Sequence, residues 1–446
     1  MAKVEAPEEI RQPAEGVGLA DVVIGIPGPV DVQRLQSLTA AVPSALSTVR
    51  GLRSESTGDA AAPDRSKVVV LYPCPPGLPN LTESQAEGVR FVSYDLHGAT
   101  NPQLPWLGQA AAYESLFNLA QQMQAHVCVV LNPDLLALQA HDIAGLSTPV
   151  LAGECDLAMP LYPIGRFEGL LNRAVLAPVA RALYGKRVRF PLAQDFAVSA
   201  ALLPLMLQQI AKSRMQGQTL LWPATEAAVR EAKICQVHLQ VHHEFSAEGV
   251  DLTAILNQVV GPLFFDMERH ASAWQRTRGS QETMVRGTLD AQTTAGPAGG
   301  DQTVDPRPMI EAFQLGHRSL QEVWSLVLPP ITLLELKHLS RQPLESFSMG
   351  DQLWARVVYD FALAHRLRTL SRSHLLGALT PLYLGWVGSY VTQILKLAGN
   401  AASANGSDDS DGIDEGERRA ERLARAFEET KPYLLQRWRW PDRFNP

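Results

Sequence analysis

The sequence has little of what marks a secreted, membrane-spanning or nucleic-acid-binding protein. Its four cysteines lack the paired spacing of metal or redox motifs, so reduced thiols and a cytoplasmic location are expected. The net charge of -7 provides no general field for nucleic acid or an anionic membrane. No apolar run is long enough to span a bilayer, and the polar, acidic start does not resemble a secretory signal.

The length and composition favour more than one domain. A chain of 446 residues, 46% of them hydrophobic, can bury a large core. We expect a disordered tail at 1–19, a first domain at 20–286, a flexible Gly-, Thr- and Pro-rich linker at 287–308 and a second domain at 309–446. Inside the second domain, residues 401–416 are rich in Ser, Asn and Asp and are expected to be disordered.

Short apolar runs closed by turn residues predict buried strands in the first domain. These runs lie at 21–27, 67–72, 91–94, 126–131, 157–161 and 233–241. Segments with apolar residues at three- and four-residue spacing lie between them and predict helices, as at 108–123 and 252–276. Beyond residue 308 the same spacing continues, so the second domain is expected to be helical.

The clearest local signal lies in residues 155–199. An amphipathic segment there stops at Gly185, and a basic cluster that includes Lys186 and Arg189 follows. The lone carboxylate of Asp195 then interrupts an otherwise apolar stretch. A buried carboxylate is costly unless it is paired, hydrogen-bonded, protonated or bound to an ion. Asp195 is therefore expected to have a specific role.

This stretch resembles the GT-A glycosyltransferases of the glucosylglycerate synthase and glucosyl-3-phosphoglycerate synthase type. Their recurring phrase, Arg-Ala-Leu-Tyr-Gly-Lys-x-Arg-Gln-Pro-Ile-Gly-Gly-Asp-Phe, resembles RALYGKRVRFPLAQDF here, which has one more residue between Lys186 and Arg189. Phe190 replaces the usual glutamine, and Ala193 and Gln194 replace the glycine pair. The likeness runs from about residue 21 to the last residue. It implies an α/β GT-A fold, in which a mostly parallel sheet is flanked by helices and followed by a helical C-terminal domain.

The resemblance also implies an activity and a set of site residues. The activity is transfer of a hexose from a nucleoside diphosphate sugar to a small acceptor such as glycerate, with retention and with help from Mg²⁺ or Mn²⁺. The implied metal ligands are Asp134 and His243. The positions implied for the donor sugar or nucleotide are Pro27, Gly108, Asp134 and Asp195, and those for the acceptor or phosphate are Arg166, Asn172, Lys186 and Arg189.

Simpler explanations of the same residues stay open at this point. Asp134 taken alone would be a cap of the helix expected to begin at Leu135. His243, next to another histidine, would be an exposed loop residue. The basic cluster after Gly185 equally fits a solvated turn.

Several positions that the family uses at its site are replaced in this chain. Asn132 stands at the first acid of the Asp-x-Asp motif, Gln109 at a lysine and Thr219 at an acid. A proline-rich segment, PCPPGLP, stands where an acidic, glycine-rich nucleotide loop is usual. A conserved framework with a changed site suggests an alternative, namely a catalytically degenerate homologue that binds or assembles with an active paralogue. The chain could instead pair with a second copy of itself as a homodimer.

Overall fold

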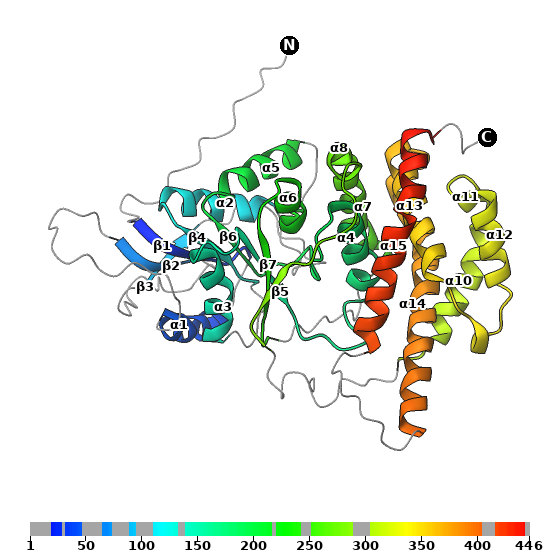
Figure 1. Ribbon diagram of the computed structural model, residues 1–446, viewed down its shortest axis with the longest axis horizontal. Helices are drawn as coiled ribbons and strands as arrows, with labels where there is room; N and C mark the ends of the chain where they lie inside the picture. Colours follow the sequence, from blue (N-terminus) through cyan, green and yellow to red (C-terminus); the bar gives the residue numbers. More distant parts are fainter. Residues whose placement is uncertain are drawn as a thin grey trace, which may run out of the picture.

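The computed structural model describes residues 19–28, 32–46, 65–73, 89–94, 110–132, 139–215, 220–241, 251–288, 304–403 and 415–441. These residues form an eight-stranded sheet with helices on its faces and a group of long helices beside it (Figure 1). This is the architecture that the resemblance to the GT-A fold implies. The prediction of a mostly parallel sheet, flanking helices and a helical C-terminal region is confirmed.

The sheet has the strand order β3-β2-β1-β4-β6-β5-β7-β8. Its strands are β1 (Leu19–Gly25), β2 (Arg65–Pro73), β3 (Val89–Tyr94), β4 (Val127–Val130), β5 (Leu157–Leu161), β6 (Phe196–Ser199), β7 (Ile234–His238) and β8 (Met284–Arg286). Among the described strands, β6 alone runs antiparallel to its neighbours, which are β4 and β5. The sequence analysis did not predict β6, because its apolar residues merge with the apolar helix that follows.

The first part of the chain also contains helices, some on the faces of the sheet and others packed against the C-terminal helices. They are α1 (Val32–Leu46), α2 (Ala110–Gln122), α3 (Ala140–Leu151), a π-helical turn (Asn172–Leu176), α4 (Ala177–Tyr184), α5 (Leu203–Met215), α6 (Pro223–Val229), α7 (Leu252–Arg269) and α8 (Ala271–Trp274). Helices α1 and α3 pack together on one face, and α2 and α5 pack together on the other (Figure 1).

The helix after β4 that the structure describes, α3, begins at Ala140, where Gln139 is its N-cap and forms a capping box with Asp142. The expected helix start at Leu135 and its cap, Asp134, lie outside the described residues. The predicted end of α4 is confirmed: Gly185 adopts a φ of +70°, and a Cβ there would lie 2.6 Å from Thr277 Cγ2.

The described residues of the C-terminal part form a set of helices. They are α10 (Arg307–Ser319), α11 (Gln321–Ser325), α12 (Pro330–Leu339), a 3-10 turn (Leu344–Ser346), α13 (Asp351–Leu367), α14 (Arg372–Ser403) and α15 (Glu415–Arg439). Helix α14 continues through Pro381 and lies close to α10, since a Cβ on Gly385 would meet the Phe313 ring at 2.9 Å. Helices α14 and α15 both extend into the segment 401–416 that was expected to be disordered, while 404–414 lie outside the described residues.

Two apolar cores hold the molecule together. The first lies between the sheet and its helices. The second joins α4, α7 and α8 to the C-terminal helices, and it includes Phe264, Trp274 and Trp354. Trp354 of α13 also donates its indole N–H to the Ala174 carbonyl in the π-helical turn, at 2.8 Å. The C-terminal helices therefore pack against the first part of the chain. None of the described helices is long and apolar enough to cross a membrane.

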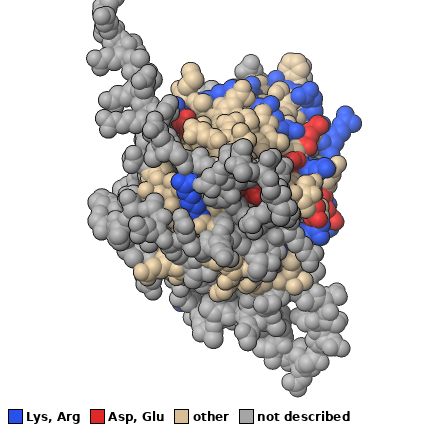
Figure 2. Space-filling view, turned by 90° about the vertical axis from the view of Figure 1, so that its left-hand side faces the viewer, with Lys and Arg blue, Asp and Glu red and all other residues tan. Residues whose placement is uncertain are grey.

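Charges of both signs share the surface at the sheet end of the molecule. Figure 2 looks onto the left-hand side of Figure 1, and basic and acidic side chains lie next to one another along its right-hand margin. On this face the charged residues that the structure describes do not gather into a field of one sign.

Candidate functional site

Strand polarity brings four chain segments to one edge of the sheet. Because β6 runs against β4 and β5, its first residue lies at the edge where β1, β4 and β5 end. Pro27 follows β1, Asn132 follows β4, Tyr162 follows β5, and Asp195 directly precedes β6. Ligands of α/β folds bind beyond the carboxyl ends of the strands. The structure thus places Pro27 and Asp195, both predicted donor residues, along the edge where such a site is expected.

The Asp195 carboxylate is fully buried and is held by two groups from neighbouring strands. Its Oδ1 accepts the backbone N–H of Asn132 at 2.6 Å, and its Oδ2 accepts the Tyr162 hydroxyl at 2.5 Å. Burial, and then the Asp195 carboxylate, raise the pKa of Tyr162 well above its usual value. Of the four alternatives left open for this carboxylate, the structure shows hydrogen bonding, and Asp195 ties the ends of β4 and β5 to the start of β6.

Aromatic side chains fill the space beside this carboxylate. The Tyr162 ring meets the Phe190 ring edge to face, with 5.0 Å between centroids, and the Arg189 guanidinium lies 5.8 Å from the Phe190 centroid. At the other side, the Tyr94 hydroxyl donates to the Ile26 carbonyl at 2.6 Å, next to Pro27. The replacement of glutamine by Phe190 thus adds apolar bulk close to Asp195.

The predicted acceptor or phosphate residues fall into two groups. Asn172 donates its side-chain amide to the Arg189 carbonyl at 2.9 Å, so these two lie together. Lys186 instead donates to Gln281 Oε1 at 3.1 Å. Arg166 is half-buried, and its backbone carbonyl accepts a hydrogen bond from the Tyr390 hydroxyl at 2.8 Å. Asp134, His243 and Gly108 lie outside the described residues.

The basic cluster has an acidic partner that the sequence analysis did not identify. Glu417 Oε1, on α15, accepts from Arg173 at 3.1 Å and from Arg189 at 2.7 Å. Burial lowers the pKa of Arg189, as does the adjacent charge of Arg173, while Glu417 opposes that shift. Although burial alone raises the pKa of Glu417, the two guanidiniums hold it below its ordinary value. Only the fold brings these residues together, since they are far apart in sequence.

A second polar cluster lies between α6 and the end of α7. The ligand-type atoms of Glu226, Asp266 and His270 all lie within 4.8 Å of one another, as the donors of a metal site would. The guanidinium of Arg269, however, already donates to both carboxylates, and the Tyr184 hydroxyl donates to Asp266 at 2.8 Å. Burial raises the pKa of Asp266, although Arg269 opposes that shift. In this arrangement a side-chain cation takes the place that a metal ion would take.

No protein-family model and no curated protein matches the chain. Among solved structures, it is similar to glucosyl-3-phosphoglycerate synthase from Mycobacterium tuberculosis in complex with Mn²⁺, UDP-glucose and phosphoglyceric acid. The identity is 19% and the TM-score 0.31, with 57% of this chain and 80% of that chain covered. A complex of the same enzyme with Mn²⁺, UDP and glucosyl-3-phosphoglycerate has 16% identity and a TM-score of 0.31, covering 58% of this chain and 86% of that chain.

Proposed function

We propose that the chain transfers a hexose from a nucleoside diphosphate sugar to a small acceptor such as glycerate, with retention at the sugar carbon and with a divalent metal ion. The observation that supports this most is the construction of the sheet edge. A buried carboxylate, Asp195, fixes the ends of two strands where α/β folds bind ligands, with Pro27 along the same edge.

The proposed metal ligands follow strands that end at this edge. Asp134 follows β4 and His243 follows β7, and both strands run parallel to β5 in the sheet. Strands β4 and β7 are three strand spacings apart, which is about 14 Å. Residues that follow the two strands can span such a distance. The Asp134 carboxylate suits Mg²⁺ or Mn²⁺ with water completing the shell, and the His243 imidazole would add a nitrogen ligand. When bound, the ion would neutralise charge on the departing diphosphate.

The proposed acceptor or phosphate residues are Arg166, Asn172, Lys186 and Arg189. Lys186 and Arg189 donate to Gln281 and Glu417, and an acceptor would have to compete with these partners. The same observation favours a second function, in which the chain is a degenerate homologue that binds an active paralogue. There the basic cluster would serve folding rather than phosphate binding.

The test is calorimetric titration of the full chain with UDP, GDP and ADP, first with Mg²⁺ or Mn²⁺ and then with a chelator. We expect one nucleotide to bind only with metal present. His243→Ala should weaken this binding about tenfold or more, because it removes a proposed metal ligand. His374→Ala, at an exposed position at the start of α14, is the matched control and should leave it unchanged.

Two results would count against the proposal in different ways. Equal nucleotide binding with and without chelator would rule out the metal assignment while leaving a nucleotide site. Absence of binding by all three nucleotides would favour the partner-binding function, and the search would then turn to a protein that co-purifies with the chain.

A further inference from the structure

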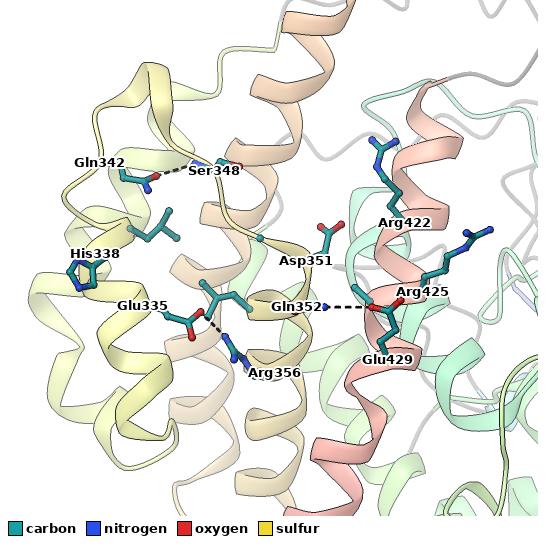
Figure 3. A pocket seen from close by; sticks show the side chains of 14 residues that line it. Glu335, His338, Gln342, Ser348, Asp351, Gln352, Arg356, Arg422, Arg425 and Glu429 are labelled. Atoms are coloured by element: carbon teal, nitrogen blue, oxygen red, sulfur yellow. Dashed lines mark hydrogen bonds and ion pairs between the residues drawn. The ribbon is translucent and has the colours of Figure 1, made fainter.

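The C-terminal helices border an open cavity that has no part in the proposed transfer reaction. Its volume is about 730 Å³, within the range of about 300–1,000 Å³ typical of small-molecule sites. Its lining comes from α12, from the start of α13 and from α15, as Figure 3 shows for Glu335, Asp351, Gln352, Arg422 and Arg425. The position and size of the cavity suit a small molecule.

The hydrogen-bond acceptors of this cavity are already engaged. Each carboxylate in the lining has a donor in the protein: Asp351 with Arg419, Glu335 with Arg356, and Glu429 with Gln352. The Gln342 side-chain oxygen accepts the Ser348 amide at 3.3 Å. A cationic ligand would therefore have to compete with arginines for Asp351 and Glu335.

Three arginines, Arg356, Arg422 and Arg425, also line the cavity. Arg356 Nε is buried and has no hydrogen-bond partner among the described residues. Arg422 and Arg425 hold ion pairs with Glu415 and Glu421, acids of α15 that do not line the cavity. These two side chains are 52% and 65% exposed, so their guanidiniums can reorient toward a ligand at small cost.

The start of α13 adds backbone donors to the same lining. The first-turn amides of a helix have no acceptor within it, and the N-cap of α13 is Gly350, which has no side chain to accept from them. Gly350 and the first residues of α13 line the cavity. Because α13 has 17 residues, its dipole also favours negative charge at this end.

We propose that this cavity binds a small soluble anion with several negatively charged oxygens, an organic phosphate or a polycarboxylate. Its oxygens would accept from Arg356 Nε, from Arg422 and Arg425, and from the amides at the start of α13. Charge-assisted bonds from guanidiniums on α13 and α15 give such a ligand both affinity and orientation. This site is separate from the sheet edge and does not depend on the proposed transferase activity.

The test uses two probes on the full chain, inorganic pyrophosphate and citrate. Calorimetric titration at low salt should detect binding of at least one of the two probes. A chelator is included so that no metal-dependent nucleotide site can bind them. The probe that binds identifies phosphate or carboxylate as the preferred chemistry. Replacing both cations, R422A with R425A, should weaken binding about tenfold or more, because two charge-assisted donors are lost.

The matched control is Arg418→Ala. Arg418 is an exposed arginine of α15 that does not line the cavity, so the binding constant should change less than about twofold. An equal loss in this control would show that general surface charge, not the cavity, attracts the anion, and would overturn the proposal.

Gly350→Asp separates binding from folding. A Cβ at Gly350 meets no atom within 4 Å, and aspartate is a favoured N-cap, so thermal stability should be kept or slightly raised. The new carboxylate would occupy the first-turn amides and repel an anion, so binding should be lost. The proposal fails if the unaltered chain binds neither probe, or if binding survives both Gly350→Asp and the double arginine variant.

Discussion

At the scale of single residues, Asp195 shows how one buried charge organises a site. Its two oxygens accept from a backbone amide and from a hydroxyl, and these come from segments on different strands. The sequence revealed that Asp195 needed a partner, since a carboxylate inside an apolar stretch cannot be left unsatisfied. It could not reveal that Asn132 and Tyr162 are the partners, because β6 had not been recognised and its direction decides which groups meet.

Asp195→Ala should destabilise the fold by about 2–4 kcal/mol, because it leaves a buried N–H and a buried hydroxyl without an acceptor. The free energy of unfolding in urea measures this. Tyr162→Phe removes a single hydrogen bond, so its cost should be nearer about 1 kcal/mol. Similar, small losses in both variants would show that the carboxylate has no structural role.

At the scale of elements, α15 joins the C-terminal helices to the first part of the chain through charged groups as well as apolar ones. Arg173 is 1% exposed, and its charged partner is Glu417 in the first turn of α15. Arg181 of α4 likewise pairs with Glu421 and Glu428 of the same helix. Helical periodicity predicted α15, but periodicity along one segment does not indicate which arginine of another segment it will meet.

Glu417→Ala should lower the free energy of unfolding by about 2 kcal/mol, because a buried guanidinium loses its charged partner. The loss is smaller than for a fully buried pair, because the Glu417 side chain is 42% exposed. Glu415→Ala, on the same turn but paired with the exposed Arg422, should change the value by less than about 0.5 kcal/mol. Urea unfolding of the two variants measures both changes in the free energy of unfolding. Equal changes would contradict the prediction.

At the scale of the whole molecule, the second core crosses the expected boundary between the two parts. Phe264 and Trp274 of α7 and α8 belong to it, together with Trp354 and Trp386 of the C-terminal helices. Apolar runs and helical spacing were enough to predict most strands and helices, because each is a local pattern. Which helices share a core depends on contacts between distant segments, and no local pattern contains that information.

A chain truncated after Gly287 should therefore fail to fold on its own, since it would expose the apolar faces of α4, α7 and α8. We expect aggregation, or loss of a cooperative urea transition, relative to the full chain. A soluble truncated monomer that unfolds in one cooperative step would show that the first part forms an independent domain.

The bond between Asn132 and Asp195 has an evolutionary consequence. The donor is the main-chain amide of residue 132, not its side chain, so every amino acid except proline supplies the same N–H. Substitution of one side chain for another at this position is thus neutral toward this bond. The site can drift in chemistry while its scaffold stays under selection, and a lineage can lose or change activity here without first losing its fold.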